Sequence, residues 1–423
     1  MADKLSTEPY KGVRDFYPAD WARMQAMFAS IRGVLARAGY EEYQASPLER
    51  AELYEAKTSE EIVNEQTYTF TDRGDRRVTL RPEMTPTLAR MIAGKRREIP
   101  FPARWFSIGN RFRYERPQKG RLREFYQADI DLVGASEGEA DIEVVTIASQ
   151  ILRSFGANES DFVVRMNSRP LLNAACAAAG LKGDAVKQYL HLLDRKAKMP
   201  PEEFAAAASA LAHEDPLAII NDAGSSPEVA AEKKKLLDRI NALSSRGVGN
   251  VVFDPSITRG FDYYTGMVFE FFDTNPENPR SLFGGGRYDG LVALFGGDPI
   301  PAVGFALGDV TLSDFLDTHG LAPKITDAAP QLYLGTPQAG DIPAAQAFAQ
   351  ALREKSCRVF VNLSDKSLGD QIKDAVKRGI PLFAAYGANE VANNALRLKV
   401  LATGSEEAMA LTEVPARLAA ERA

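Results

Sequence analysis

The segment "ARWFSIGNRFRYERPQKGRLREFYQADIDLVG", residues 103–134, indicates how the centre of this chain folds. Its two ends, "ARWFSIGNRFRYE" and "REFYQADIDLVG", alternate apolar with polar residues and are rich in aromatic side chains, a pattern typical of β-strands. Between them lies "RPQKGRL", in which Pro117 and Gly120 are turn formers. The segment therefore predicts two antiparallel strands joined by a basic loop.

Residues 111–123 concentrate positive charge in a chain whose net charge is -6. The stretch holds one acid, Glu115, and six cations: Arg111, Arg113, Arg116, Lys119, Arg121 and Arg123. Such a run is often only a solvated face. The alternative is that Arg113, which alternates with two aromatic residues, sits on the strand and aims its guanidinium at a small phosphate ligand. The loop would then follow the backbone of a nucleic-acid end.

Length and composition bound the class of protein. A chain of 423 residues predicts two or three domains, and 45% hydrophobic and 26% charged residues are ordinary for a soluble globular protein. No run approaches the roughly 18 apolar residues of a membrane span, and the N-terminal segment lacks an apolar signal core. We therefore expect a cytoplasmic protein with no membrane partner.

Cysteine and histidine usage narrows the chemistry. The two cysteines, Cys176 and Cys357, are far apart, and the three histidines, His191, His213 and His319, are scattered. This predicts no disulfide framework, no cysteine or histidine metal site and no histidine-based triad. Chemistry must then come from arginines, acids, tyrosines and glycines, or from a Mg²⁺ ion that needs few protein ligands.

Periodicity and turn residues divide the chain into three regions. They predict helices at 20–39, 85–95 and 139–156, a hairpin at 67–81, and strands at 250–256 and 267–273. Residues 168–245 are rich in Ala, Lys and Glu and predict a helical insertion. After a linker at 324–331, strands alternate with helices, which favours a small α/β domain with a largely parallel sheet.

The octet "RGFDYYTG", residues 259–266, is a dense polar and aromatic cluster between two glycines. Arg259 follows "VVFDPSIT", so we expect a strand end to present its side chain. Tyr263 and Tyr264 are adjacent and would face opposite ways on a strand, one in the core and the other lining a pocket. The alternative is a glycine-bounded turn whose tyrosine packs into the core.

A second glycine-rich segment is "GGGRYDGL", residues 284–291. Three successive glycines are costly in regular structure, so they suit a backbone that approaches a ligand closely or adopts positive φ. A flexible turn is the alternative. The glycine spacing differs from the dinucleotide-binding fingerprint, so that class of site is not indicated.

Two further segments place carboxylates at informative positions. In "TLRPEMTPTLAR", Glu83 and Thr85 stand between a strand and a helix, where they either cap the helix or receive a ligand ammonium. Alternate positions of "EFYQADIDL" hold Gln127, Asp129 and Asp131. On a strand these three share one face, and buried polar groups need partners, so we expect a polar pocket over the sheet.

Taken together, these segments closely resemble the histidyl-tRNA synthetase family of class II aminoacyl-tRNA synthetases. "TLRPEMTPT", "FRYERPQKGRLREFYQADIDLVG", "RGFDYYTG" and "GGGRYDGLV" are similar to that family's substrate segment, its motif 2 and its two histidine-specific signatures. The resemblance extends over essentially the whole chain, including "DKSLGDQIKDAVKRG" in the C-terminal region.

The resemblance implies a fold and an activity. The fold is an α+β catalytic core with an antiparallel six- to seven-stranded sheet flanked by helices, built from residues 1–167 and 246–323. A helical insertion at 168–245, a C-terminal α/β anticodon-binding domain at 328–423 and a homodimer formed partly through residues 20–50 are also implied. The activity is a histidine–tRNA ligase that uses ATP, with Mg²⁺, to make histidyl-adenylate and then charges histidine tRNA.

Residue roles likewise follow from the resemblance. Histidine would be bound by Glu83, Thr85, Gln127, Asp131, Tyr263, Tyr264 and Tyr288. The first three would hold its ammonium and the others would read its imidazole. ATP would be bound by Arg113, Arg121 and Arg259, of which Arg113 and Arg259 are the catalytic pair. The tRNA would contact Lys119, Arg121 and Arg123, and no residue is assigned to a metal.

The chain departs from the family pattern at two places. Motif 3 of the family usually reads "GFAxGLER", whereas "GFALGDVTL", residues 304–312, has Thr311 in place of the arginine and Asp309 in place of the leucine. Either another arginine or Mg²⁺ holds the ATP γ-phosphate, or adenylation is impaired. Asp131 is one methylene shorter than the glutamate of many bacterial members, so its imidazole contact is either direct or through a water.

Two other functions are alternatives. One is the histidine-binding regulatory subunit of ATP phosphoribosyltransferase, a paralogue without ligase activity that generally lacks the anticodon domain and the arginine of the first histidine signature. The other is a tRNA-binding accessory protein with no activity. This chain has both the C-terminal region and Arg259, which favours the ligase.

Overall fold

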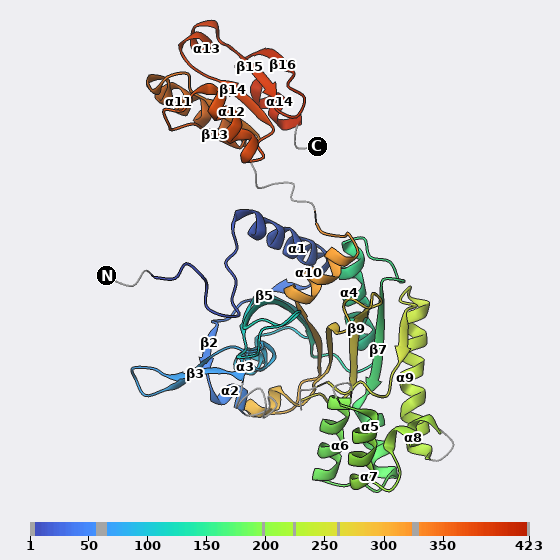
Figure 1. Cartoon of the computed structure of the whole chain (residues 1–423). Coiled ribbons are helices and arrows are strands. Elements are labelled where there is room, and N and C mark those ends of the chain that lie inside the picture. Colours follow the sequence, from blue (N-terminus) through green and yellow to red (C-terminus); the bar gives the residue numbers. More distant parts are fainter. Residues whose placement is uncertain are drawn as a thin grey trace. The chain divides into compact units, whose positions relative to one another are not determined.

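The computed structural model describes residues 5–55, 66–196, 199–222, 226–259, 263–323 and 330–420 (Figure 1). The chain divides into two compact units, Met1–Pro323 and Lys324–Ala423. Each unit has its own sheet and its own hydrophobic core. Most of the linker predicted at 324–331 lies outside the described residues.

The described residues of the first unit form an eight-stranded sheet in the order β1-β5-β6-β11-β10-β9-β7-β8. Six neighbouring strands pair antiparallel: β5 (Ala103–Phe112), β6 (Glu124–Val133), β11 (Ala302–Gly308), β10 (Ser281–Arg287), β9 (Met267–Asp273) and β7 (Phe162–Ser168). The short edge strands β1 (Glu41–Glu42) and β8 (Val251–Phe253) pair parallel with β5 and β7. The predicted α+β fold with an antiparallel sheet is confirmed, and the two parallel edge strands extend that sheet to eight.

The two faces of this sheet differ because side chains alternate along each strand. On β6, the apolar residues Ala128, Ile130 and Leu132 are buried in the main apolar cluster. Helices α1 (Pro18–Arg37) and α4 (Glu139–Ser154) bury their apolar faces in the same cluster. The polar residues that alternate with these three on β6 therefore face the other side of the sheet.

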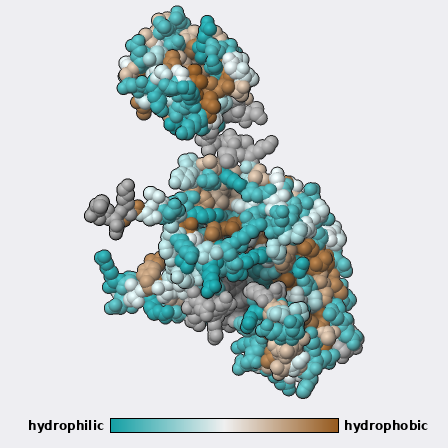
Figure 2. All heavy atoms as spheres, in the orientation of Figure 1, coloured by the Kyte–Doolittle hydropathy of each residue, from teal (hydrophilic) through white to brown (hydrophobic). Residues whose placement is uncertain are grey.

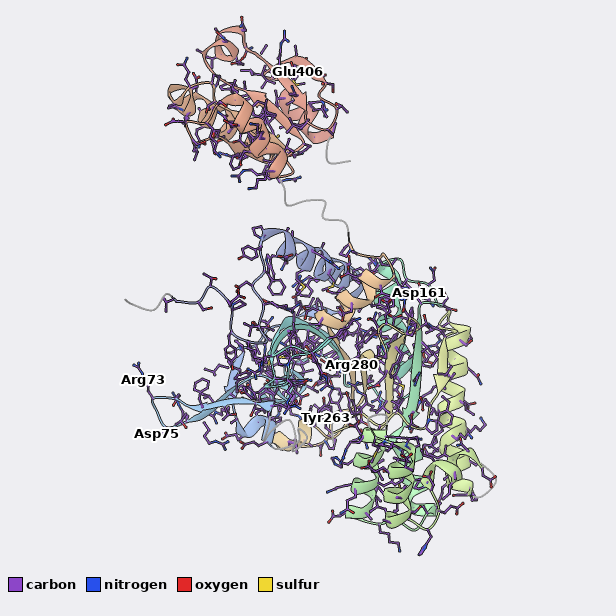
Figure 3. The ribbon with its side chains drawn as sticks, in the orientation of Figure 1. Arg73, Asp75, Asp161, Tyr263, Arg280 and Glu406 are labelled. Atoms are coloured by element: carbon purple, nitrogen blue, oxygen red, sulfur yellow. The ribbon has the colours of Figure 1, made fainter. Side chains whose placement is uncertain are left out.

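A smaller three-stranded sheet has the order β2 (Leu48–Arg50), β4 (Arg77–Leu80), β3 (Tyr68–Thr71). The β3–β4 hairpin projects from the body, with Arg73 and Asp75 near its tip (Figure 3). Helix α2 (Glu52–Glu55) contacts β2 and α3 (Thr85–Lys95), and α3 contacts the 3-10 helix η3 (Val292–Phe295). The predicted hairpin and the helix predicted at 85–95 are confirmed.

Helices occupy most of the described residues between β7 and β8. They are α5 (Arg169–Ala178), α6 (Asp184–Arg195), α7 (Pro201–Leu211), α8 (Pro216–Asn221) and α9 (Pro227–Ser245). The helical character predicted for 168–245 is therefore confirmed. Helix α9 contacts α4, β7 and β8, and the buried residues of these helices continue the apolar cluster of the sheet. Their status as a separate insertion domain stays a prediction.

The second unit is a five-stranded sheet with helices, within residues 330–420. The order is β13 (Val359–Val361), β12 (Leu332–Gly335), β14 (Leu382–Ala385), β15 (Ala395–Val400), β16 (Glu406–Ala410). The helical elements are η4 (Ala339–Asp341), α11 (Ile342–Glu354), α12 (Leu368–Lys377), α13 (Ala388–Asn393) and α14 (Val414–Ala420).

The prediction of a largely parallel sheet in this second unit is wrong for half of its strand pairs. Strands β12, β13 and β14 pair parallel, but β14–β15 and β15–β16 pair antiparallel. Only residues 401–405 separate β15 from β16, which allows a hairpin but not the longer crossover that parallel strands need. The α/β character predicted from alternating strands and helices holds for α11 and α12.

The surface of the first unit in the view of Figure 2 is mostly hydrophilic, with hydrophobic residues gathered toward its right-hand side. In the part of the chain that the structure describes, no helix is long and apolar enough to cross a membrane.

Candidate active site

A cavity of about 310 Å³ lies over β6, β10 and β11, on the side of the sheet away from α4. Every residue predicted to bind histidine or ATP lines it: Glu83, Thr85, Arg113, Arg121, Gln127, Asp131, Arg259, Tyr263, Tyr264 and Tyr288. Asp129 lines it too, so the prediction that three alternate residues of β6 share one polar face is confirmed.

The inner end of the cavity is a carboxylate surrounded by tyrosines. Asp131 is 3% exposed, and its Oδ1 accepts a hydrogen bond from the Tyr288 hydroxyl. Its Oδ2 is buried without a hydrogen-bond partner. Burial raises the pKa of Asp131 to about 8. The rings of Tyr263 and Tyr264 lie 4.9 Å apart, and that of Tyr263 lies 5.9 Å from that of Tyr288.

Both tyrosines of the "RGFDYYTG" segment line the same cavity, so the prediction that they face opposite ways is wrong. The reason is local: they follow residues 260–262, which are not described, and stand in a turn before β9 instead of on a strand. The period-2 alternation of a strand therefore does not apply to Tyr263 and Tyr264.

A second polar group lies at the start of α3. The Glu83 carboxylate is 4% exposed and accepts a hydrogen bond of 2.9 Å from the Tyr263 hydroxyl. Nearby, Gln127 Oε1 is buried without a hydrogen-bond partner. Helix α3 begins at Thr85, with Met84 at its N-cap, so neither Glu83 nor Thr85 holds the capping position that was the alternative interpretation.

Arg113 is the first residue beyond β5, and its backbone N–H still donates to Arg123 across the ladder. It was predicted on the strand itself, which ends one residue earlier. Its Nε donates to the Pro82 carbonyl at 3.0 Å, and its guanidinium lies over the Phe125 ring. No carboxylate of the described residues lies within ion-pair distance of this guanidinium, and burial lowers its pKa.

Arg259 was expected at a strand end, but β8 ends at Phe253 and Arg259 lies in the loop that follows. Its φ of 63° is in the left-handed region, which costs a non-glycine residue conformational energy. The surroundings hold it there: its Nη1 pairs with Glu270 at 2.6 Å, and its carbonyl accepts from Arg169. Burial opposes the charge of Arg259, but Tyr264 and Glu270 outweigh burial and raise its pKa.

The three glycines of "GGGRYDGL" lie inside strand β10, and none of them has a positive φ. The turn and positive-φ interpretations are therefore wrong. A Cβ on Gly284 would lie 3.0 Å from Arg259 Nη1, and one on Gly286 would lie 2.8 Å from the Tyr264 ring. The glycines thus leave room for the side chains of Arg259 and Tyr264, and Gly284 itself lines the cavity.

Of the residues predicted to contact tRNA, only Arg121 lines the cavity. It is exposed and pairs with Glu115 at 3.0 Å. Lys119 is exposed, and its Nζ donates to the Glu277 carbonyl at 3.1 Å. Arg123 is half-buried, donates to the Tyr10 hydroxyl and stacks over Tyr114, which makes it part of the support of the loop.

The sequence analysis missed the place of Glu270 in the cavity and the supporting contacts of Arg81 and Arg111, which do not line it. Glu270 pairs with Arg259. The sequence offered a signal for it, because Glu270 is the one charged residue within the apolar segment "MVFEFF" and a buried charge needs a partner. Beneath the cavity, Arg111 pairs with Asp129 at 2.5 Å, and Arg81 donates to the Ala45 carbonyl at 2.8 Å. Burial lowers the pKa of Arg81 to about 10. No local pattern distinguishes these supporting arginines from those that line the cavity.

The two motif 3 departures both lie in the first turn of α10 (Asp309–Thr318) but have different surroundings. Thr311 lines the cavity, and its hydroxyl donates to the Leu282 carbonyl at 2.6 Å. Asp309 is buried, pairs with Arg14 at 2.6 Å and accepts from the Tyr126 backbone N–H. Asp309 therefore belongs to the structural support of α10 (Asp309–Thr318).

Within the described residues, no group of three or more His, Cys, Asp or Glu side chains is arranged to hold a metal ion. A magnesium ion at this site would have to share its coordination with a phosphate ligand. Glu270 and Glu115 are cavity carboxylates of the kind that Mg²⁺ accepts.

Comparisons with known proteins agree with this geometry. A family model described as histidyl-tRNA synthetase matches residues 12–311, and one described as anticodon binding domain matches residues 334–421. A curated relative, the histidine–tRNA ligase of Leptospira biflexa serovar Patoc, is 40% identical over 429 residues, which cover 97% of this chain and 97% of that one.

Solved structures share the fold. The histidyl-tRNA synthetase of Nostoc sp. has a TM-score of 0.78 at 24% identity and covers 99% of this chain and 100% of its own. The apo histidyl-tRNA synthetase of S. aureus has a TM-score of 0.75 at 25% identity, with coverage of 98% and 100%. With a family model over most of its length and a full-length relative at 40% identity, the chain belongs to the histidyl-tRNA synthetase family.

Proposed function

We propose that this chain is a histidine–tRNA ligase. It activates histidine with ATP to histidyl-adenylate and pyrophosphate, and then transfers histidine to the 3′ end of histidine tRNA. The observation that carries the proposal is the single cavity that collects all ten side chains predicted to bind histidine or ATP from segments far apart in the sequence.

Histidine binds at the inner end of the cavity. Asp131 accepts an imidazole N–H with its unpartnered Oδ2, and a hydroxyl among Tyr263, Tyr264 and Tyr288 meets the other ring nitrogen. A side chain without both ring nitrogens leaves buried polar groups unpaired, which gives sharp discrimination. The histidine ammonium lies against Glu83, Thr85 and the unpartnered Gln127 Oε1.

The chemical step needs no enzyme nucleophile. The histidine carboxylate attacks the α-phosphorus of ATP, a new C–O–P linkage forms, and the bond to pyrophosphate breaks with its electron pair leaving on pyrophosphate. Holding the reactants in line and neutralising charge in the transition state are then most of the catalysis. Arg113, which has no carboxylate partner in the described residues, and Arg259 supply that charge.

Magnesium, bound with ATP, would supply further charge neutralisation at the phosphates. Glu270 would share in holding the ion, since its carboxylate lines the cavity beside Arg259. The family's use of ATP makes this ion the usual partner. Among the described residues no three acidic, His or Cys side chains are grouped to hold a metal, which fits an ion held largely by substrate oxygens.

The tRNA binds through two parts of the chain. Lys119, Arg121 and Arg123 meet the acceptor end from the motif 2 loop. The second unit, whose residues 334–421 match the anticodon binding domain, meets the anticodon. The homodimer and the cytoplasmic location remain predictions. Sedimentation of the purified chain tests the homodimer: a mass of twice 46.2 kDa supports it, and a mass of 46.2 kDa indicates a monomer.

The regulatory paralogue of ATP phosphoribosyltransferase is not favoured. Arg259 is present in the cavity, and the anticodon-binding match covers residues 334–421, both of which that group generally lacks. ATP–pyrophosphate exchange with each of the twenty amino acids, followed by charging of histidine tRNA, tests the proposal. Exchange that depends on histidine alone, together with charging, supports it, and histidine binding without exchange overturns it in favour of the paralogue.

A further inference from the structure

We propose that Arg280 binds the terminal phosphates of ATP at the outer end of the active-site cavity. This inference rests on the proposed function, because it adds a contact for the ATP that the same cavity takes. Arg280 is the last residue before β10 and lies in the central part of the first unit (Figure 3). It is exposed and stands just outside the cavity lining, next to Ser281, which belongs to that lining.

The two ends of the cavity differ in burial, and this difference indicates where the β- and γ-phosphates of ATP lie. Asp131 and Tyr288 at its inner end are each 3% exposed, whereas Gly120, Ser281 and Thr311 at its other end are half-buried. A histidine whose imidazole meets Asp131 leaves the α-phosphate beside Arg113 and Arg259. The β- and γ-phosphates then extend toward the half-buried end, where a polyanion needs a further cation.

Thr311 offers no charge at that end. Its hydroxyl donates to the Leu282 carbonyl at 2.6 Å, so it ties the start of α10 to β10. Arg280 lies next to it: a Cβ built on Gly120 would be 3.8 Å from Thr311 Cγ2 and 3.9 Å from Arg280 Cδ. The stem of Arg280 and the side chain of Thr311 therefore flank the same glycine of the basic loop.

The guanidinium of Arg280 is available for an anion. Its Nη2 donates to Gln118 Oε1 at 3.0 Å, a contact with a neutral side chain, and no carboxylate of the described residues lies within ion-pair distance. By contrast, Arg121 pairs with Glu115 and Arg14 pairs with Asp309. Exchanging the amide oxygen of Gln118 for a phosphate oxygen converts a neutral hydrogen bond into a stronger charge-assisted one.

The same contact links ATP to the basic loop. Gln118 and Lys119 hold the loop against the segment that leads into β10, through Arg280 and the Glu277 carbonyl. When Arg280 turns to phosphate, the loop loses one of these two hydrogen bonds. ATP binding and loop position are therefore coupled through Arg280.

Calorimetric binding of ATP to the full chain, with steady-state exchange alongside it, tests the inference. We expect Arg280→Ala to weaken ATP binding and to raise the KM for ATP by about tenfold or more, as for a lost charge-assisted contact. The KM for histidine should stay within about twofold. Arg246→Ala is the matched control, because Arg246 is an exposed arginine paired with Glu139 at the end of α9, outside the cavity lining.

The double variant Arg280→Ala with Thr311→Arg provides a rescue, since it returns a guanidinium to the same end of the cavity. Restored ATP affinity supports a role for charge at this position. Unchanged ATP affinity in Arg280→Ala overturns the inference, and so does an equal loss for ATP and histidine, which would indicate a structural role. Absence of histidine-dependent exchange in the wild type would instead count against the proposed function, while ATP binding still decides the role of Arg280.

Discussion

At Asp131 the stability of the free protein conflicts with the recognition of histidine. Its carboxyl is buried among tyrosines, and one of its oxygens has no hydrogen-bond partner. Burial of a carboxyl without full hydrogen bonding is unfavourable in the free protein. A histidine side chain removes that penalty by donating to the free oxygen, so the site gains specificity for a ligand that offers an N–H at this point.

The titration of Asp131 predicts a pH-dependent stability. Burial raises its pKa from 3.8 to about 8, so the folded protein keeps a proton that the unfolded chain releases within that range. The protonated carboxyl therefore contributes to the free energy of unfolding. This contribution is fully present below the unfolded pKa and is lost as pH rises through the folded pKa of about 8. Between the two pKa values, the free energy of unfolding falls by at most about 1.4 kcal/mol per pH unit. We therefore expect Asp131→Asn to gain thermal stability over wild type progressively from pH 5 to pH 8.

Melting temperatures of the two proteins across this pH range provide the measurement. Saturating histidine should stabilise wild type much more than the variant. A difference in melting temperature that stays constant with pH would mean that Asp131 is already ionised in the free protein, contrary to this account.

At the residue scale, the sequence predicted the members of the cavity well and their conformations poorly. The polar face of β6 followed from period-2 alternation, which is a local property. The left-handed backbone of Arg259 and the shared orientation of Tyr263 and Tyr264 depend on contacts with Glu270, Arg169 and β10, far away in sequence. Residue types indicate chemistry, but such contacts decide where a loop residue points.

Among the elements, β10 shows why glycines stand in a central strand. A strand normally disfavours glycine, which has no side chain to pack. Here the absence of side chains brings the Arg259 guanidinium and the Tyr264 ring down onto the sheet. At these glycines of β10, the backbone of the sheet itself lies directly beneath the Arg259 and Tyr264 side chains.

Gly286→Ala tests whether β10 needs a residue without a side chain at this position. Its Cβ would lie 2.6 Å from the Met267 carbonyl and 2.8 Å from the Tyr264 ring, so both the backbone at the start of β9 and Tyr264 must shift. We expect a loss of about 1–3 kcal/mol in stability and a raised KM for histidine. Gly290→Ala is the matched control, since a Cβ there meets no atom within 4 Å. Equal behaviour of the two variants would contradict this role for β10.

The basic loop is the second element with a specific role. Lys119 lies outside the cavity lining, whereas Arg121 lines it, so the two cations of one loop are expected to act on different steps. Lys119→Glu should leave ATP–pyrophosphate exchange within about twofold of wild type and lower tRNA charging several-fold, more strongly at low salt. Lys234→Glu, a charge reversal on the exposed side of α9, serves as the control. Equal losses in exchange and charging for Lys119→Glu would refute the separation.

Predictability differed between elements for physical reasons. Helices α1 and α4, which have amphipathic spacing and a glycine stop, helix α3 and the β3–β4 hairpin have local signals, and their predictions are confirmed. Strands β7, β10, β11 and β16 were not predicted. The three glycines of β10 do not predict a strand, but pairing with β9 on one side and β11 on the other holds these residues in one. Pairing partners distant in sequence leave no trace in the local pattern.

The whole molecule separates activation from part of tRNA recognition. The apolar clusters of the first unit lie within residues 24–316, and those of the second lie within 332–418. Every residue of the cavity lies in the first unit. Since each unit buries its own core, the first should fold without the second.

A chain truncated after Pro323 tests this separation. We expect it to keep histidine-dependent ATP–pyrophosphate exchange within about threefold of the full chain, because its cavity is intact. Charging of histidine tRNA should fall by about 100-fold or more, as expected when a contact surface worth several kcal/mol is removed. A folded truncated protein that loses exchange would show that activation depends on the second unit.

The meeting of segments around residues 83, 113, 127, 259 and 288 in one cavity is a property of the whole molecule. Composition and periodicity predicted the separate segments, and only the family resemblance predicted that they converge. The structure places all of them around one cavity: residue 127 lies on strand β6, and the others lie in segments next to strands or helices. The strands that carry these segments pair from sequence positions far apart. Topology of this kind follows from non-local pairing, which single-sequence patterns do not specify.

The proposed chemistry depends on fixed guanidinium groups that allow the carboxylate of histidine itself to attack ATP. It is tested by histidine-dependent ATP–pyrophosphate exchange in Arg259→Ala, with histidine binding measured by calorimetry. Arg165→Ala, an arginine of β7 paired with Asp254, is the control. We predict that exchange falls by about 100-fold or more in Arg259→Ala, the scale of a lost transition-state contact, while histidine still binds. Undiminished exchange in this variant would contradict the account.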